Sequence, residues 1–329
     1  MNFSLTPEQE LLREAARTAL SRIDTVAGAR AALDGAPLPD LWPTACLAGW
    51  TGLLVPEQFG GAGLGAFDAM LVMEQCGRRL AGGGLLGHLA ATMILSDSGH
   101  DLLPALASGE LRAAVVWSGQ FDPDVADADW LVTRDGLLAA DQVVVEPVTR
   151  GDASRPLGHV RVNGVQPEPL SGDFEQAWHV TQALLAADAL GVAETMLELS
   201  VAYAKERHTF GRPIGSYQAV KQQVVEILRH AGTTRSLCFY AGYAAESQPE
   251  ELPLAASAAR FAAEEAAEYA TRTCIAIHGG IGATWEHDAH LYWRRAQLSR
   301  LLLGGVAGAG DRVAEEIIAR ARAREESVV

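Results

Sequence analysis

The spacing of apolar residues divides the chain into three stretches. Over the first third, apolar residues recur every three to four positions, which is typical of amphipathic helices. Short apolar runs separated by turn residues follow from Ala113 to about Leu170, which is typical of strands. Helical spacing then resumes. This order predicts an α+β fold that is mainly α-helical, with an N-terminal helical domain (1–112), a small antiparallel β domain (113–170) and a C-terminal four-helix bundle (171–329).

Local signals place the elements within these stretches. Thr6, Pro7 and Gln9 form a helix start, since threonine can cap, proline suits the first helical position and Gln9 can close a capping box. An Asp-Gly pair at 135–136 and an Asn-Gly pair at 163–164 are typical of hairpin turns. The expected helices of the N-terminal domain cover 7–23, 27–33, 42–48, 66–80, 87–96 and 102–108. The expected bundle helices lie near 174–206, 216–246, 252–280 and 306–323.

Composition narrows the class of protein. The chain has 329 residues, of which 49% are apolar, so a large core is expected. The formal net charge of -15 argues against nucleic acid and anionic membranes as partners. Without a basic signal segment or a long apolar run, the chain is expected to be cytoplasmic. The cysteines are scattered without a Cys-x-x-Cys pair, which predicts buried free thiols at Cys46, Cys76, Cys238 and Cys274.

The most informative segment joins the first two bundle helices. Residues 206–218 read Glu-Arg-His-Thr-Phe-Gly-Arg-Pro-Ile-Gly-Ser-Tyr-Gln. Arg207 can hold two phosphate oxygens with its planar fork, and Gln218 falls in the first turn of the next helix, where amides favour an anion. Gly211 is expected to take the left-handed conformation that ends the first helix, and Pro213 to prevent its continuation. An ordinary helix hairpin with a charged loop would use the same residue types.

A second glycine-rich segment lies at the end of the third bundle helix. Gly279, Gly280 and Gly282 lack a Cβ, so their amides can form an anion-binding nest close to a ligand. Several potential metal ligands are nearby, but their spacing matches no metal motif, and no metal is predicted. These residues are His278, Glu286, His287, Asp288 and His290.

Together the two segments resemble the acyl-CoA dehydrogenase family. The resemblance rests on Arg-x-Thr-Phe-Gly-x-Pro-Ile at 207–214, on Gly-Gly-x-Gly at 279–282 and on a Gly-Trp…Pro-Glu…Gly-Gly-x-Gly run at 49–63, and it covers the whole chain. In that family the turn grips the pyrophosphate of an FAD that belongs mainly to a neighbouring subunit. The resemblance therefore implies FAD as the cofactor. It implies binding by Arg207, Thr209, Phe210, Gln218, His278, Gly279, Gly280 and Gly282.

The chain departs from the family where the chemistry takes place. A carboxylate base must remove the α-proton of the acyl thioester. The family's usual base position, after the second segment, corresponds to Leu303, and the position used in some branches corresponds to Thr181. Neither side chain accepts a proton at neutral pH. The resemblance therefore predicts no catalytic residue in this chain.

The β domain also departs from the family. It is roughly half the usual size and lacks the Thr-Glu-Pro…Gly-Ser-Asp and Trp-Ile-Thr/Ser segments that hold the flavin ring. The segments 117–119 and 130–133 are better explained by tryptophans that pack in the core. Ala276 replaces the glutamine that normally precedes the glycine block, which removes one hydrogen bond on the phosphate side.

These departures resemble the short subunit of actinobacterial α2β2 acyl-CoA dehydrogenases. That resemblance implies a full-length homologue as partner, which would hold the flavin ring and the base while this chain clamps the ADP half of a shared FAD. It also implies an acyl-CoA substrate, with steroid side chains as an analogy, and an electron-transferring flavoprotein as the electron acceptor.

Other interpretations stay open at this point. A self-sufficient dehydrogenase would need a relocated base, for which Glu175 and Asp188 on the first bundle helix are the candidates, although a solvent-facing role is simpler for both. A structural protein on the same scaffold would bind neither FAD nor CoA. A flavin monooxygenase would still need a flavin-ring site, and the sequence shows none.

Overall fold

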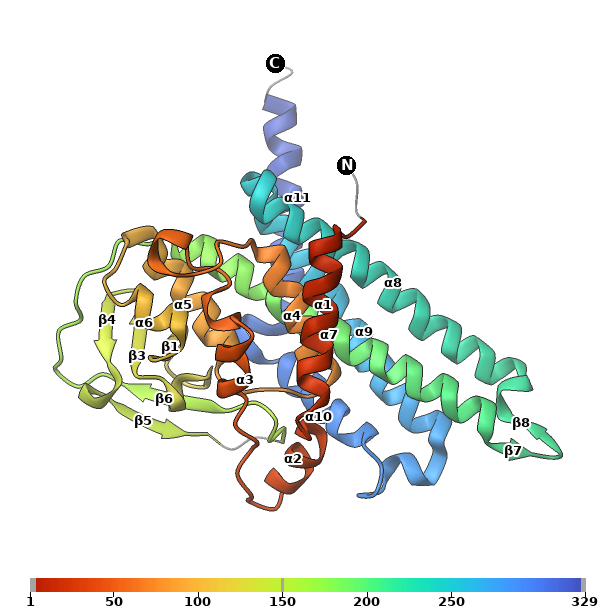
Figure 1. The fold of residues 1–329 in the computed structure, drawn as a ribbon. Helices are drawn as coiled ribbons and strands as arrows, with labels where there is room; N and C mark the ends of the chain where they lie inside the picture. Colours follow the sequence, from red (N-terminus) through yellow and green to blue (C-terminus); the bar gives the residue numbers. More distant parts are fainter. Residues whose placement is uncertain (1–3, 149–150, 327–329) are drawn as a thin grey trace.

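The computed structural model describes residues 4–148 and 151–326 of the chain. Its N-terminal part is helical, as predicted (Figure 1). The helices are α1 (Pro7–Ser21), α2 (Thr25–Ala32), α3 (Trp42–Leu47), α4 (Ala66–Arg78), α5 (Leu85–Ser98) and α6 (Leu103–Ser108). The predicted capping box is present at the start of α1, because Gln9 N donates to Thr6 Oγ1 at 3.2 Å and Thr6 N donates to Gln9 Oε1 at 3.1 Å.

The middle of the chain forms two small sheets in its described residues, ordered β1-β3-β4 and β2-β6-β5. The strands are β1 (Ala113–Val115), β2 (Asp122–Pro123), β3 (Trp130–Thr133), β4 (Gly136–Ala139), β5 (Val144–Pro147) and β6 (Leu157–Arg161). One pairing differs from the antiparallel expectation, since β1 pairs with β3 in parallel. The chain between these two strands is long enough to cross over, and it contains β2, so β1 and β3 are not joined by a hairpin.

Long helices make up the C-terminal part. They are α7 (Phe174–Glu206), α8 (Gln218–Ser247), α9 (Leu252–His278), α10 (Ala289–Ser299) and α11 (Gly305–Glu326). The four predicted bundle helices correspond to α7, α8, α9 and α11, and the prediction is confirmed to within a few residues at each end. The shorter α10 was not predicted, and it packs mainly against α9. The end of α11 projects from the body of the molecule (Figure 1).

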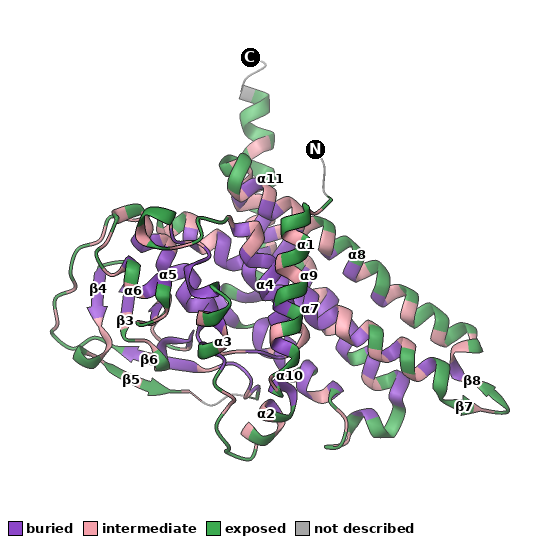
Figure 2. Cartoon of the chain, in the orientation of Figure 1, coloured by how far each residue is buried: buried purple, intermediate pink, exposed green. Residues whose placement is uncertain are grey.

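The main core lies where α7 meets α4, α8 and α9, and these faces are buried in Figure 2. Many of the buried positions on α7 and α9 are alanines, which let the helix axes approach closely. Helices α4 and α7 also approach closely. There a Cβ on Gly77 would meet Asp188 O at 1.9 Å, and a Cβ on Gly191 would meet Glu74 O at 2.0 Å. Two glycines therefore join the N-terminal helices to the bundle.

A buried ion network joins all three parts of the chain. Asp188 on α7 accepts from Arg155 Nη2 at 2.9 Å and from Arg295 Nη2 at 2.7 Å. Arg155 lies between β5 and β6, Arg295 lies on α10, and Arg295 Nη2 also donates to Ala81 O, between α4 and α5, at 2.9 Å. Burial alone would raise the pKa of Asp188, but the two guanidinium groups hold it below the usual range. The solvent-facing role expected for Asp188 is therefore wrong, because its carboxylate is fully buried and binds two arginines.

The prediction of buried free thiols is confirmed for Cys76, Cys238 and Cys274 and is wrong in burial for Cys46. All four are free, three of them are buried, and Cys46 is half-buried. Burial raises the pKa of the Cys76, Cys238 and Cys274 thiols, so these side chains stay protonated and unreactive at neutral pH.

Candidate functional site

The segment after α7 forms a short β-hairpin. Arg207 leaves the helix in an extended conformation (φ -74°, ψ 124°), and its carbonyl accepts from Ile214 N at 2.7 Å. Strand β7 (His208–Thr209) then pairs with β8 (Arg212–Pro213). The Arg207 side chain is exposed, and no described carboxylate pairs with it. A free guanidinium therefore stands at the base of the hairpin.

Phe210 and Gly211 form the tip of this hairpin. Both have positive φ, +51° and +80°, as a tight hairpin turn requires. Gly211 is therefore left-handed, as predicted, but its predicted place at the helix end is wrong. Helix α7 already stops at Glu206, because the chain turns there into β7, and Pro213 in β8 does not end it. Phe210 is 97% exposed, so a large aromatic ring is held in water in a backbone conformation that non-glycine residues rarely adopt.

Helix α8 begins beside this hairpin. Gln218 is its first residue and so lies in the first turn, as predicted, and no side chain caps the first amides. Tyr217 precedes it and fastens the hairpin, because its hydroxyl donates to Thr209 O at 3.0 Å and its ring lies 4.2 Å from the Arg212 guanidinium. The uncapped amides keep the positive end of a 30-residue helix open to an anion.

The glycine block sits at the end of α9. Gly279 has φ +66° and ends the helix, and a Cβ on Gly279 or Gly280 would meet no atom within 4 Å. Gly282 is buried, and a Cβ there would lie 2.7 Å from Ile275 O. Gly282 is thus needed for packing, whereas Gly279 and Gly280 leave open space over the backbone.

His278 lies inside this end of the bundle. Its ring stacks on Tyr203 of α7 at 4.2 Å between centroids and lies 4.2 Å from the ring of His287. Its Nδ1 donates to Cys274 O at 2.8 Å. The His278 side chain therefore joins α7 to the glycine block. The sequence singled out His287 only as a potential metal ligand and did not single out Tyr203, because a tyrosine one turn before the end of α7 gives no signal of such a stack.

The two segments meet although they are far apart in the sequence. Ala204, Ile214 and Ile277 form a small buried cluster between the ends of α7 and α9, with Tyr217 packed against it. The structure thus brings the hairpin, the start of α8 and the glycine block to one end of the bundle.

The usual base positions lie in the packed core. Thr181 is 1% exposed and donates its hydroxyl to Ala177 O at 2.7 Å. Leu303 is 7% exposed with φ +51°, and its carbonyl lies 3.3 Å from Gln182 Nε2. Neither residue carries a proton acceptor, and side chains of α7 and of the segment before α11 cover both.

The acidic residues nearby have other partners. Asp188 is bound by two arginines, and Glu175 is exposed, with Arg134 Nη2 3.1 Å from its carboxylate. The sequence gave no reason to single out Glu264 on α9, which is fully buried with Arg260 Nε 3.0 Å from its carboxylate. Burial raises the pKa of Glu264 to about 7. Such a buried Arg–Glu pair at helical spacing (i, i+4) cannot be told from an exposed pair by sequence.

The β domain tryptophans pack as expected. Trp117 meets the ring of Trp178 edge-on at 5.1 Å between centroids, and Trp130 packs against a buried cluster formed with α5. These contacts support the core-packing interpretation of segments 117–119 and 130–133.

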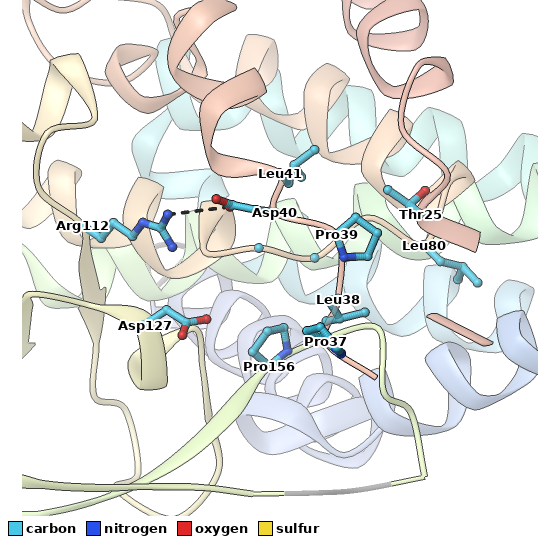
Figure 3. Close-up of a pocket in the computed structure, with 12 residues that line it drawn as sticks. Thr25, Pro37, Leu38, Pro39, Asp40, Leu41, Leu80, Arg112, Asp127 and Pro156 are labelled. Carbon is cyan, nitrogen blue, oxygen red and sulfur yellow. Dashed lines mark ion pairs between the residues drawn. The ribbon is translucent and has the colours of Figure 1, made fainter. Parts of the chain in front are cut away.

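A cavity of about 350 Å³ opens elsewhere, between the N-terminal helices and the β domain (Figure 3). Its charged side chains are Asp40, Asp127 and Arg112, and the Arg112 guanidinium lies 3.7 Å from Asp40. It is lined by none of the predicted site residues. Within the described ranges, no group of His, Cys, Asp and Glu side chains is arranged to hold a metal, and no described helix is long and apolar enough to cross a membrane.

Comparison with known families identifies both helical parts. Residues 6–110 match the acyl-CoA dehydrogenase N-terminal domain, and residues 174–321 match the acyl-CoA dehydrogenase C-terminal domain. Among curated relatives, "Acyl-CoA dehydrogenase IpdE2" of Mycolicibacterium smegmatis is 34% identical, over 91% of this chain and 96% of the relative.

Two further similarities concern length and fold. "Acyl-CoA dehydrogenase FadE34" of Mycobacterium tuberculosis is 38% identical over 93% of this chain but only 47% of its own length, so this chain spans about half of that relative. The solved structure described as the Tcur3481-Tcur3483 steroid ACAD G363A variant has a TM-score of 0.85 at 27% identity, over 96% of this chain and 99% of the matched chain. The chain belongs to the acyl-CoA dehydrogenase family.

Proposed function

We propose that this chain is the FAD-clamping, non-catalytic subunit of a heteromeric acyl-CoA dehydrogenase. The observation that carries the proposal is an asymmetry. Arg207, Phe210, Gln218, Gly279 and Gly280 are exposed at one end of the bundle, with Arg207 unpaired and Phe210 97% exposed. Thr181 and Leu303, at the usual base positions, are buried and cannot accept a proton.

The residues at the clamp fit the ADP half of FAD. Arg207 and the uncapped first turn of α8, including Gln218, supply charge and amides for the pyrophosphate. Phe210 supplies an exposed aromatic face, and Gly279 and Gly280 supply backbone without side chains in the way. His278 acts through its packing, because its ring fixes the glycine block against α7. Thr209 contributes through the hairpin, where its carbonyl accepts from Tyr217.

A division of labour explains why the clamp faces outward. Side chains that grip a phosphate and an adenine are of use only if another surface closes over the ligand. Phe210 supports the same conclusion, since an aromatic ring that is 97% exposed has no packing partner among the described residues of its own chain. The second chain would supply the flavin-ring site and the base that this chain lacks.

The relatives support a paired arrangement. FadE34 is about twice as long as this chain, so one polypeptide there has room for two such units. The Tcur3481-Tcur3483 structure is described as a steroid ACAD and names two components. We infer a full-length homologue as partner and a bulky acyl-CoA, such as a steroid side-chain ester, as substrate of the assembly. An electron-transferring flavoprotein is the inferred electron acceptor.

Bound FAD would supply the hydride acceptor for α,β-dehydrogenation. This chain's own contribution is binding and orientation. Arg207 neutralises phosphate charge, and the hairpin and glycine block hold the ADP half so that the ring is fixed in the partner's site. No proton transfer is assigned to this chain, because its acids on α7 are either paired inside, as Asp188 is, or exposed, as Glu175 is.

The alternatives lack a supporting observation. A self-sufficient enzyme would need Asp188 or Glu175 as base, and Asp188 is held as an arginine-bound carboxylate. A scaffold without FAD gives no reason for an unpaired Arg207 beside an uncapped helix.

The proposal predicts that Arg207→Ala lowers FAD occupancy in the assembled complex. Loss of a charge-assisted, bidentate contact with the phosphate weakens FAD binding by about 10-fold or more. The measurement is flavin absorbance per complex after co-expression with a full-length homologue from the same genome, where wild type is expected to hold about one FAD per pair of unlike chains.

The control is Arg134→Ala, which removes another exposed arginine, this one from the β domain, and should leave FAD occupancy unchanged. Circular dichroism of each variant checks folding. Unchanged occupancy in Arg207→Ala, or a wild-type chain that is fully flavinated when expressed alone, would show the clamp proposal to be wrong.

A further inference from the structure

An apolar groove of about 300 Å³ lies between the end of α7 and the start of α8. Its lining is almost entirely aliphatic or backbone. The lining residues are Val201, Ala204, Lys205, Gly215, Val220, Lys221, Val224 and Val225. The groove adjoins the hairpin without containing any predicted FAD-binding residue.

The groove collects the two lysines of the whole chain. All other permanent cations in the sequence are arginines. Lys205 comes from α7 and Lys221 from α8, and both are exposed. Neither forms an ion pair with a described residue, although most arginines of the structure are paired. Two free ammonium groups therefore flank an aliphatic groove in a chain whose net charge is -15.

The apolar surface continues beyond the groove along α8. Val225 is 56% exposed and Leu228 is 57% exposed, and with Val220 and Val224 they lie on one side of the helix. Figure 2 shows that the outer side of α8 is exposed over most of its length. An elongated stripe of this kind fits a packed helix better than a small molecule, because a small ligand in the groove would leave Leu228 in water.

Charge decides against a second copy of this chain as the occupant. In a two-fold contact whose axis passes through the groove, residues near the axis face their own copies, so lysine would lie against lysine. No acidic side chain lines the groove to relieve that repulsion. A cationic rim around an aliphatic floor is instead complementary to a helix with aliphatic residues flanked by carboxylates.

We propose that the α7–α8 groove docks an acidic, aliphatic helix of the partner subunit, with Lys205 and Lys221 pairing its carboxylates. This inference rests on the proposed function for the existence of that subunit. It adds the surface that binds the partner, the chemistry of the partner's helix and a reason why this chain binds a different subunit and not a second copy of itself. The groove adjoins the hairpin that carries Phe210, so one partner chain can cover both.

The experiment compares the affinity of this chain for the full-length homologue, by sedimentation velocity, at low and at high salt. The double variant Lys205→Glu/Lys221→Glu should weaken association about 10-fold at low salt and less at high salt, because attraction becomes repulsion that salt screens. Lys205→Arg/Lys221→Arg should restore wild-type affinity. Both lysines are exposed, so folding is expected to be unaffected.

The matched control is Arg17→Glu/Arg134→Glu, which changes net charge equally at exposed sites on α1 and in the β domain. Equal weakening in both double variants, or none in the lysine variant, would overturn the inference and leave the clamp proposal intact. A homodimer of the isolated chain that the lysine variant disrupts would show that a second copy occupies the groove, which also overturns it. If the lysine double variant weakens association but Arg207→Ala leaves FAD occupancy unchanged, the groove proposal stands and the clamp proposal is wrong.

Discussion

Asp188→Asn is expected to destabilise the protein by about 3–5 kcal/mol, since it leaves two buried arginines without their counter-ion. Arg155 and Arg295 both donate to Asp188, and all three side chains are buried. Asparagine has nearly the same shape as aspartate, so the loss of stability would come from the missing charge and not from a cavity. The two guanidinium groups would then face each other across a neutral amide that can accept hydrogen bonds at only one atom.

Urea unfolding of wild type and variant at several pH values measures this effect. The pKa of Asp188 is lowered in the folded state, so its contribution is fully present above the unfolded pKa of about 4 and is lost as pH falls through the folded value. The two stability curves should therefore approach each other in acid. Glu175→Gln on the same helix is the control, because its exposed pair with Arg134 contributes about 0–1 kcal/mol. Similar losses in both variants would contradict the role given to the buried network.

The fold could be predicted because its signals are local. The capping box at Thr6 and the long runs of helical spacing fix where α1, α7, α8 and α9 lie, and the structure confirms them. The parallel pairing of β1 with β3 could not be predicted, because strand direction depends on how the intervening chain crosses the sheet. Short strands carry too few residues to specify their neighbours.

The candidate site was predictable in composition but not in geometry. Arg207 and Gln218 lie where their spacing indicated, at the junction of α7 and α8. Gly211 was assigned the correct conformation at the wrong place, since a left-handed glycine serves a helix end and a hairpin tip equally well. The stack of Tyr203 on His278 joins two helices whose relative position no local pattern encodes.

The buried charged side chains were the features that the sequence predicted least well. Asp188 and Glu264 share their helices with acids that are less buried, and a single sequence does not show which acid is buried against an arginine. The partners of Asp188, Arg155 and Arg295, come from distant segments, whereas Arg260 lies one turn before Glu264 on the same helix. The contacts of Asp188 are tertiary, so they become visible only when the three parts of the chain are placed together.

Gly191→Ala is expected to destabilise the protein by roughly 3 kcal/mol, although alanine is the better helix former by about 1 kcal/mol. The new Cβ would lie 2.0 Å from Glu74 O and 2.8 Å from Arg78 N. Both are backbone atoms of α4, so no side-chain rotation can relieve the clash, and α4 must move away from α7. That movement would also disturb the buried carboxylate of Asp188, one turn earlier on α7.

Gly232→Ala on α8 is the matched control, because a Cβ there would meet no atom within 4 Å. It should raise the free energy of unfolding by about 0.5–1 kcal/mol through helix propensity alone. The same substitution is thus expected to act with opposite sign at two helical glycines, as measured by urea unfolding. If Gly191→Ala left the free energy of unfolding unchanged or raised it, α4 could move away from α7 without cost. The close contact at this crossing would then not be what joins the N-terminal helices to the bundle.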